Sequence, residues 1–240
     1  MIDVAFTPEE AARAPLEGVT AVVIDVVRAS TTIVTALARG ARGVVPVTSP
    51  EEAIVRARSW PGGGALRGGE RGGVPPPGFE CGNSPAEYTA DRVGGRTVVF
   101  TTTNGTRALL AVDGAKRVAV GGFANAGAVV AWLARQGGDV LLVCAGELGR
   151  FCLEDAVCAG LLATRLAEAT PRATLSDAAR AAVALYTHYA DLERMLRDAA
   201  WAQALVGQGQ GADLPFCIQV DAYDVVPVAR DGTLVPAGRD

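Results

Sequence analysis

The chain has 240 residues, half of them hydrophobic, and its 22 basic and 26 acidic side chains give a formal charge of −4. The length suits a single α/β domain, and the apolar content supports a packed core, which excludes a mainly disordered chain. Lys116 is the only lysine, so a Walker-type phosphate loop, which needs a lysine after its glycines, is also excluded. The mild acidity, without a basic stripe, argues against nucleic-acid binding.

The sequence shows neither a targeting segment nor a membrane-spanning one. The first ten residues, MIDVAFTPEE, are too short and acidic for a signal peptide, and no run of 18 apolar residues occurs. Five scattered cysteines without a CxxC pair, and His188 as the only histidine, argue against disulfides and a structural zinc site. We therefore expect a cytoplasmic protein without a membrane partner. Its Ala-rich helical segments are compatible with a homodimer.

Short apolar runs alternate with helical patterns along most of the chain. Strands are predicted, in chain order, over residues 19–27, 44–47, 65–69, 97–101, 117–120, 139–144 and 216–220. Helices are predicted over 30–39, from 50 onward, and over 85–92, 105–112, 125–135, 153–169 and 175–206. This alternation predicts one α/β domain over residues 1–240, with a mainly parallel sheet flanked by helices. A C-terminal hairpin turning at Asp231-Gly232 is expected to add an antiparallel edge.

Sheets of this type bind ligands beyond the carboxyl ends of their strands. The strand 19–27 contains Asp25, which is followed by Arg28 and by the hydroxyl groups of Ser30 and Thr31 at the start of a helix. A carboxylate in an apolar strand is costly to bury unless it is paired or binds a cation, and a helix N-terminus attracts anions. An ion pair between Asp25 and Arg28, with Ser30 as a helix cap, is the purely structural alternative.

Later loops carry similar groups. Residues 68–73 place Glu70 and Arg71 between glycine pairs, and glycine lets the backbone approach a ligand closely. Ordinary solvated turns and helix caps also explain each loop when it is taken alone. The remaining polar candidates stand before predicted helices, and they are Asn83, Ser84, Thr102, Asn104, Gly105, Thr106 and Arg107.

Two features follow the strand 139–144. Cys144 and Arg150 have the Cys-x5-Arg spacing of cysteine phosphatases, but this spacing occurs often by chance and Glu147 would disfavour the thiolate. Glu154 and Asp155 open the next helix, where the helix dipole favours acids and where carboxylate oxygens also suit Mg²⁺.

Taken together, these segments resemble one family, the 2-phosphosulfolactate phosphatases (ComB family). The departures from the family pattern are small: Val27 replaces a common Leu, Glu80 replaces a common Asp, and three prolines stand at 75–77. The role of Glu80 is therefore open. The matching segments cover nearly the whole chain in the expected order, and they are IDVVRASTTIVTAL (24–37), GGERGG (68–73), GFECGNSPAEYT (78–89), TTTNGTRAL (101–109), CAGELGRFCLEDAVCAG (144–160) and CIQVDAYDVVP (217–227).

The resemblance implies a family-specific α/β fold and a Mg²⁺-dependent phosphatase acting on (2R)-2-phospho-3-sulfolactate, or a related 2-phospho-hydroxy acid, in a step toward coenzyme M. A non-catalytic anion-binding protein on the same scaffold is the alternative, and the cysteine phosphatase is a further one. We expect Asp25 to act as a metal ligand or as the nucleophile, two roles that the sequence does not separate.

The expected site contains three kinds of residue. Mg²⁺ is held by Asp25 and by acids among Glu70, Glu154 and Asp155. Charge in the transition state is neutralised by Arg28, Arg71 and Arg107. The small anionic phosphate ester is bound by Ser30, Thr31, Asn83, Ser84, Thr102, Asn104, Gly105 and Thr106.

Overall fold

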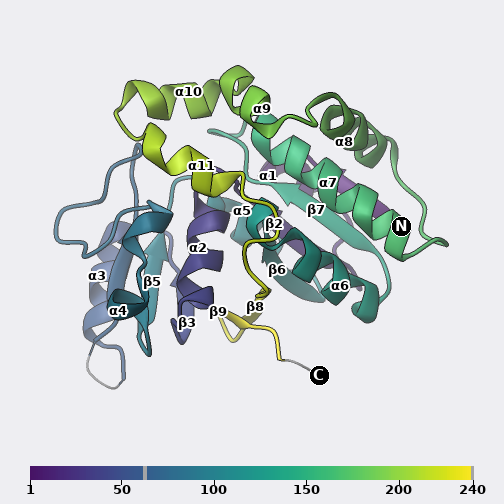
Figure 1. Ribbon diagram of the computed structural model, residues 1–240. Coiled ribbons are helices and arrows are strands. Elements are labelled where there is room, and N and C mark those ends of the chain that lie inside the picture. Colours follow the sequence, from purple (N-terminus) through teal and green to yellow (C-terminus); the bar gives the residue numbers. More distant parts are fainter. Residues whose placement is uncertain (62–63, 239–240) are drawn as a thin grey trace.

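The computed structural model describes residues 1–61 and 64–238. In this part of the chain, nine strands form one sheet in the order β1-β7-β2-β6-β8-β9-β3-β5-β4 (Figure 1). The predicted α/β fold with a mainly parallel sheet is confirmed. The strands are β1 (Ile2–Ala5), β2 (Thr20–Ile24), β3 (Gly43–Pro46), β4 (Leu66–Gly69), β5 (Thr97–Thr101), β6 (Arg117–Gly121), β7 (Val140–Cys144), β8 (Pro227–Arg230) and β9 (Thr233–Pro236).

The C-terminal hairpin joins two parallel blocks of this sheet. β1, β7, β2 and β6 are parallel in one block, and β3, β5 and β4 are parallel in the other. β8 pairs antiparallel with β6 and β9, and β9 pairs antiparallel with β3. The predicted hairpin is confirmed, but its predicted place at an edge is wrong. It lies between the blocks because Val228 is buried in the core of the first block and Leu234 in that of the second.

Helices cover both faces of the sheet, and Figure 1 shows α2, α6 and α7 in front of it. The helices are α1 (Pro8–Ala11), α2 (Ala29–Ala38), α3 (Pro50–Arg58), α4 (Ala90–Val93), α5 (Gly105–Ala111), α6 (Ala126–Gln136), α7 (Leu153–Ala169), α8 (Asp177–His188), α9 (Leu192–Asp198), α10 (Ala200–Gly207) and α11 (Leu214–Cys217), with 3-10 turns η1 (Pro85–Glu87), η2 (Phe123–Asn125) and η3 (Gly211–Asp213).

The strands β2, β5 and β7 are buried along their whole length because both of their faces are covered. In β2, Val22 and Ile24 pack in the cluster that contains α6 and α7, whereas Ala21 and Val23 pack with α1 and α5 on the other face. The same alternation places Phe100 of β5 with α2, whereas Val99 packs with α3. Three layers of this kind leave the loops after the strands as the places where polar groups can gather.

Several predicted elements differ from the structure. Residues 2–11, which the sequence patterns leave unassigned, form β1 and α1. The predicted helix 85–92 is interrupted at Tyr88, whose buried ring separates η1 from α4 and whose hydroxyl donates to the Gly82 carbonyl oxygen at 2.6 Å. The predicted helix 175–206 is three helices, because Asp191 caps a new one and Ala199 is extended.

The predicted strand 216–220 is wrong. Residues Leu214–Cys217 form the short helix α11, with a proline in its first turn. An apolar run of this length fits a helix as well as a strand, and tertiary packing decides between them. Within the described residues, no helix is both long enough and apolar enough to cross a membrane.

Candidate active site

Asp25 directly follows β2 and is buried, with a relative exposure of 9%. Its side-chain Oδ1 accepts the backbone N–H of Ala29 at 3.1 Å, in the first turn of α2. Its own backbone N–H donates to the Ser30 hydroxyl at 2.8 Å. The carboxyl group is therefore held rigidly at the strand end by the helix that the sequence predicts there.

Ionising this carboxyl group is costly. The pKa of Asp25 is raised to about 7, chiefly by burial. The hydrogen bond from Ala29 opposes this rise, and the charges of Glu70, Glu154 and Glu147 contribute to it. Four acids from four different segments thus influence one another at this point. A cluster of like charges in a buried place favours either protonation or a bound cation.

The start of α5 lies directly against Asp25. A Cβ atom on Gly105 would stand 2.9 Å from Asp25 Oδ2 and 2.9 Å from Ala29 Cβ, so only glycine fits. Thr102 and Thr106 hold this turn by reciprocal bonds, in which the backbone N–H of each donates to the other's hydroxyl at 3.2 and 3.3 Å. The structure therefore brings the predicted residues after β2 and β5 together.

Glu70 ties the loop after β4 to the loop after β5. Its two carboxylate oxygens accept the backbone N–H groups of Thr103 at 2.7 Å and Gly73 at 2.8 Å. The next residue, Arg71, donates from its guanidinium group to the carbonyl oxygens of Thr48 and Glu70 and to the Thr101 hydroxyl. The guanidinium group of Arg71, which we predicted to neutralise charge in the transition state, instead holds these loops together.

The loop after β7 closes the same region. Asn104 donates from Nδ2 to Glu147 Oε2 and accepts the backbone N–H of Leu148 at its own oxygen, at 3.1 Å. Burial raises the pKa of Glu147, although the hydrogen bond from Asn104 opposes this. Asn104, predicted to bind substrate, therefore lies against this loop, and its amide holds the loop in position.

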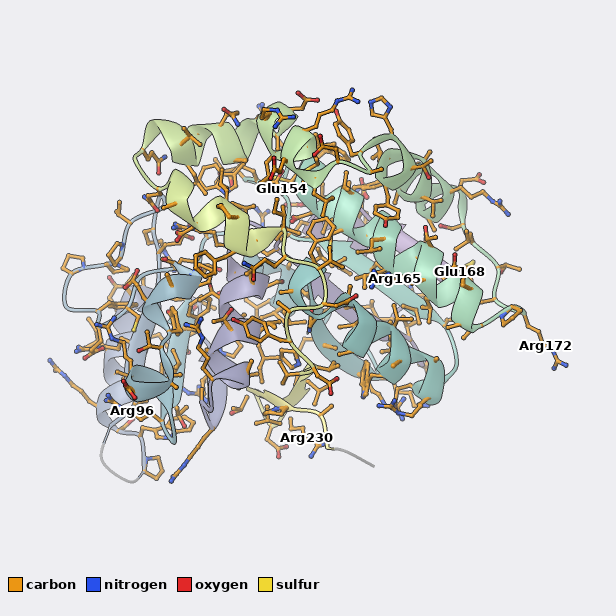
Figure 2. The ribbon with its side chains drawn as sticks, viewed as in Figure 1. Arg96, Glu154, Arg165, Glu168, Arg172 and Arg230 are labelled. Carbon is orange, nitrogen blue, oxygen red and sulfur yellow. The ribbon has the colours of Figure 1, made fainter. Side chains whose placement is uncertain are left out.

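The two acids at the start of α7 differ sharply. Asp155 accepts the backbone N–H groups of Val26 at 2.8 Å and Gly146 at 3.0 Å, so both oxygens link β2 to the β7–α7 loop. Glu154 is 1% exposed, and neither of its oxygens has a hydrogen-bond partner among the described residues. Figure 2 shows this side chain at the start of α7, beneath α9 and α10. Burial raises the pKa of Glu154, so this carboxyl group is either protonated or available to a cation.

Arg28 is also buried, at 4% exposure, but its partner is one that the sequence did not indicate. Its guanidinium group donates to Asp213 Oδ2 at 2.6 Å and to the Gly73 carbonyl oxygen at 3.0 Å. The other oxygen of Asp213 accepts the Ser84 hydroxyl. The pairing of Arg28 with Asp25, our structural alternative, is thus not what the structure shows.

Other predicted residues lie at the edge of this region or outside it. Thr31 donates from its hydroxyl to the Val26 carbonyl at 2.8 Å, and Asn83 is 6% exposed with an unpaired side-chain oxygen among the described residues. Arg107 is exposed on α5 and forms an ion pair with Glu9 of α1. Of the predicted arginines, Arg107 is therefore the one that lies away from Asp25.

A cavity of about 380 Å³ opens beside Glu154. Its walls include three acids, Glu147, Glu154 and Asp198, and a single basic residue, Arg150. Asp25 lines a separate, small space of about 10 Å³. An anionic ligand entering the larger cavity would meet mostly negative charge unless a cation were bound there.

Comparison with known proteins assigns the family. The model of the 2-phosphosulpholactate phosphatase family matches residues 5–232. A protein of Symbiobacterium thermophilum is 47% identical over 221 residues, which are 92% of this chain and 95% of the relative. A relative from Thermotoga petrophila is 40% identical, and the match covers 98% of this chain and 98% of the relative. A relative from Clostridium beijerinckii is 34% identical, and the match covers 97% of this chain and 98% of the relative. All three carry the name "Probable 2-phosphosulfolactate phosphatase".

This chain belongs to the 2-phosphosulpholactate phosphatase family. The resemblance expected from the sequence motifs is therefore confirmed. The family members cover the chain almost from end to end, so the described loops around Asp25 and Glu154 lie inside the matched region.

The donor set suits a hard cation such as Mg²⁺. Within residues 1–61 and 64–238, no three His, Cys, Asp or Glu side chains are grouped to hold a metal ion by themselves. Magnesium usually keeps several waters and binds through one or two carboxylates plus substrate phosphate, so three protein acids are not required. Glu154, whose oxygens are unpartnered among the described residues, and Asp25, whose pKa the Glu154 charge raises, are the two acids that could hold such an ion.

The structure gives the thiol of Cys144 no support as a nucleophile. Cys144 is fully buried at the end of β7, and burial raises its pKa well above the ordinary value. A neutral thiol in a core does not attack phosphate. His188 is exposed and contacts Arg194 and Tyr189, as expected for a surface residue.

Glu80, whose role the sequence left open, pairs with Arg67 of β4. Its side chain accepts the Arg67 backbone N–H at 2.8 Å and the Nε–H at 3.0 Å. Partial burial raises the pKa of Glu80, but these hydrogen bonds outweigh it and lower the pKa overall. Glu80 therefore fastens the loop 70–80 to β4 and does not line the cavity beside Glu154.

The sequence reasoning considered Glu147 and Arg150 only as parts of the cysteine-phosphatase alternative, and it missed Asp213. Glu147 and Arg150 stand in the segment CAGELGR directly after a strand, which is the position that marked the other candidates. Asp213 offered no such signal, because it follows a Gly-Gln run far along the chain and meets Arg28 only through the fold.

Proposed function

We propose that this protein is a Mg²⁺-dependent phosphatase that hydrolyses (2R)-2-phospho-3-sulfolactate, or a related 2-phospho-hydroxy acid, to sulfolactate and phosphate. Family membership supports phosphoric monoester hydrolysis, and the single observation that carries the site is the buried, unpartnered carboxyl group of Glu154 near Asp25. The coenzyme M pathway remains a prediction from the resemblance.

Glu154 and Asp25 are the residues that would hold the metal. When bound, Mg²⁺ polarises the phosphoryl group and activates water. Glu70 and Asp155, also predicted as ligands, have both oxygens on backbone N–H groups and set the positions of the loops after β4, β5 and β7. Their contribution to the site is rigidity, which keeps the reacting groups in place without reorganisation.

Arg28 is buried at the start of α2, and its guanidinium group is held by Asp213 and Gly73. Because the Asp213 carboxylate offsets its charge, Arg28 acts mainly by fixing the start of α2 beside Asp25. We expect the phosphate ester to bind in the cavity beside Glu154.

The proposal is tested by measuring phosphate release from a panel of monoesters, with and without Mg²⁺. We expect turnover of 2-phosphosulfolactate that requires Mg²⁺ and falls by about a hundredfold or more in Asp25→Asn. Asp113→Asn, an exposed change just beyond the C-terminal end of α5, is the matched control and keeps full activity. Absence of Mg²⁺-dependent release would favour the alternative of a non-catalytic anion-binding protein.

A further inference from the structure

The arginines that the sequence analysis selected are committed to internal partners. Arg28 is paired with Asp213, Arg71 donates to two backbone carbonyls and a hydroxyl, and Arg107 is paired with Glu9. A substrate with a phosphate and two further acid groups requires more cationic contacts than these side chains leave available.

Arg150 is in a different situation. It lines the 380 Å³ cavity that Glu154 also lines. Among the described residues its hydrogen bonds are those of its backbone, and its guanidinium group forms no ion pair there. It is also the single basic residue in the wall of that cavity. A cation among three acids that nevertheless lacks a partner is available for a ligand.

The backbone beneath Arg150 is firmly placed. Glu147 and Arg150 exchange backbone hydrogen bonds of 3.0 Å in both directions, which closes a tight hairpin. Asn104 fixes one side of this hairpin and Asp155 fixes Gly146 at its base. The attachment point of Arg150 is therefore fixed beside the cavity.

We propose that Arg150 binds the sulfonate or carboxylate group of the substrate and so selects 2-phospho acids over simple phosphate monoesters. This inference rests on the proposed function. The planar guanidinium group matches the oxygens of a carboxylate or sulfonate in a two-pronged contact. Glu154 lies deep in the cavity and Arg150 at its exposed rim, so phosphate and the second anion are recognised at different ends.

The test compares three substrates that differ in their second anion: 2-phosphosulfolactate, 2-phospholactate and isopropyl phosphate. In Arg150→Gln we expect KM for 2-phosphosulfolactate to rise by roughly 10- to 100-fold, with little change in kcat, and KM for isopropyl phosphate to stay unchanged. KM for 2-phospholactate rises in the same way if Arg150 binds the carboxylate, and stays unchanged if it binds the sulfonate. Arg150→Lys retains part of the preference. Arg135→Gln, an exposed arginine beside a different cavity, behaves as wild type. An equal loss on all three substrates, or no loss on any, would overturn the assignment.

Equilibrium binding separates this inference from the proposed function. Sulfolactate and inorganic phosphate are titrated separately into the wild-type protein and Arg150→Gln by calorimetry. We expect the variant to lose affinity for sulfolactate by a similar factor while its affinity for phosphate is unchanged. If sulfolactate binds both proteins equally, or binds neither, Arg150 does not recognise the second anion, whatever activity the enzyme shows.

Discussion

Asp25, the acid proposed to hold the metal, is buried at the end of β2, so its ionisation in the absence of metal lowers the free energy of unfolding. Its pKa is raised to about 7, chiefly by burial. Between pH 4 and 7 the folded protein retains a proton that the unfolded chain releases. The free energy of unfolding in the absence of metal therefore decreases as pH rises through this range, and Asp25 makes no further change above it.

Asp25→Asn should remove this pH dependence. Asparagine keeps an oxygen that accepts the Ala29 N–H, but it carries no charge at any pH. In a chelator, the variant should become more stable than the wild type as pH rises from 4 to 7, by up to about 4 kcal/mol. Urea unfolding at several pH values measures the difference. A difference that stays constant from pH 4 to 8 would mean that Asp25 is not the titrating group.

At the residue scale the sequence was informative for groups that stand directly after strands. Asp25, Glu70, Asn104 and Gly105 were found because apolar runs end beside them, and the structure brings them together. Their partners were not predictable in detail, since a carboxylate such as Asp155 can bind either a cation or backbone N–H groups. Only the fold decides that choice.

At the scale of elements, the segment from α10 to α11 covers the site. Trp201 of α10 donates from its indole N–H to the Val27 carbonyl at 2.8 Å, and Asp213 at the end of η3 pairs with Arg28. Figure 1 shows this segment above α2 and β2. The sequence predicted one long helix and a strand here, because Ala-rich periodicity does not reveal where a helix must break to cover a site.

Asp213→Asn tests how much this cover depends on the buried ion pair. Removing one partner leaves the buried guanidinium of Arg28 unpaired, so we expect a loss of about 3–5 kcal/mol in unfolding free energy. Arg197→Gln breaks the exposed pair with Asp191, whose atoms are 3.7 Å apart, and should cost less than about 1 kcal/mol. Equal and small losses in the two variants would contradict the role given to Asp213.

At the scale of the whole molecule, the β8–β9 hairpin is the connection between two parallel blocks. The alternation of strands and helices predicted a mainly parallel sheet correctly, because that pattern is local. The position of the hairpin could not be predicted in the same way. It depends on which block each apolar side chain enters, and those contacts join residues more than a hundred positions apart.

Leu234→Ala should therefore be strongly destabilising even though it lies close to the C-terminus. Leu234 is 1% exposed in the core of the second block, and a large-to-small change in such a place costs about 2–5 kcal/mol. Val220→Ala, at 40% exposure, should cost well under half of that. Guanidinium unfolding of both variants gives the comparison, and a loss below about 1 kcal/mol for Leu234→Ala would show that the hairpin contributes little.

The central claim is that a buried acidic site at Asp25 and Glu154 hydrolyses a phosphate ester with the help of Mg²⁺. The most direct measurement is phosphate release from 2-phosphosulfolactate by chelator-treated wild-type protein and Glu154→Gln while Mg²⁺ is titrated. We predict no release without Mg²⁺, saturable release in the wild type, and little or none in the variant at the same Mg²⁺ concentrations. Equal release by the two proteins, or release that needs no metal, would contradict this account.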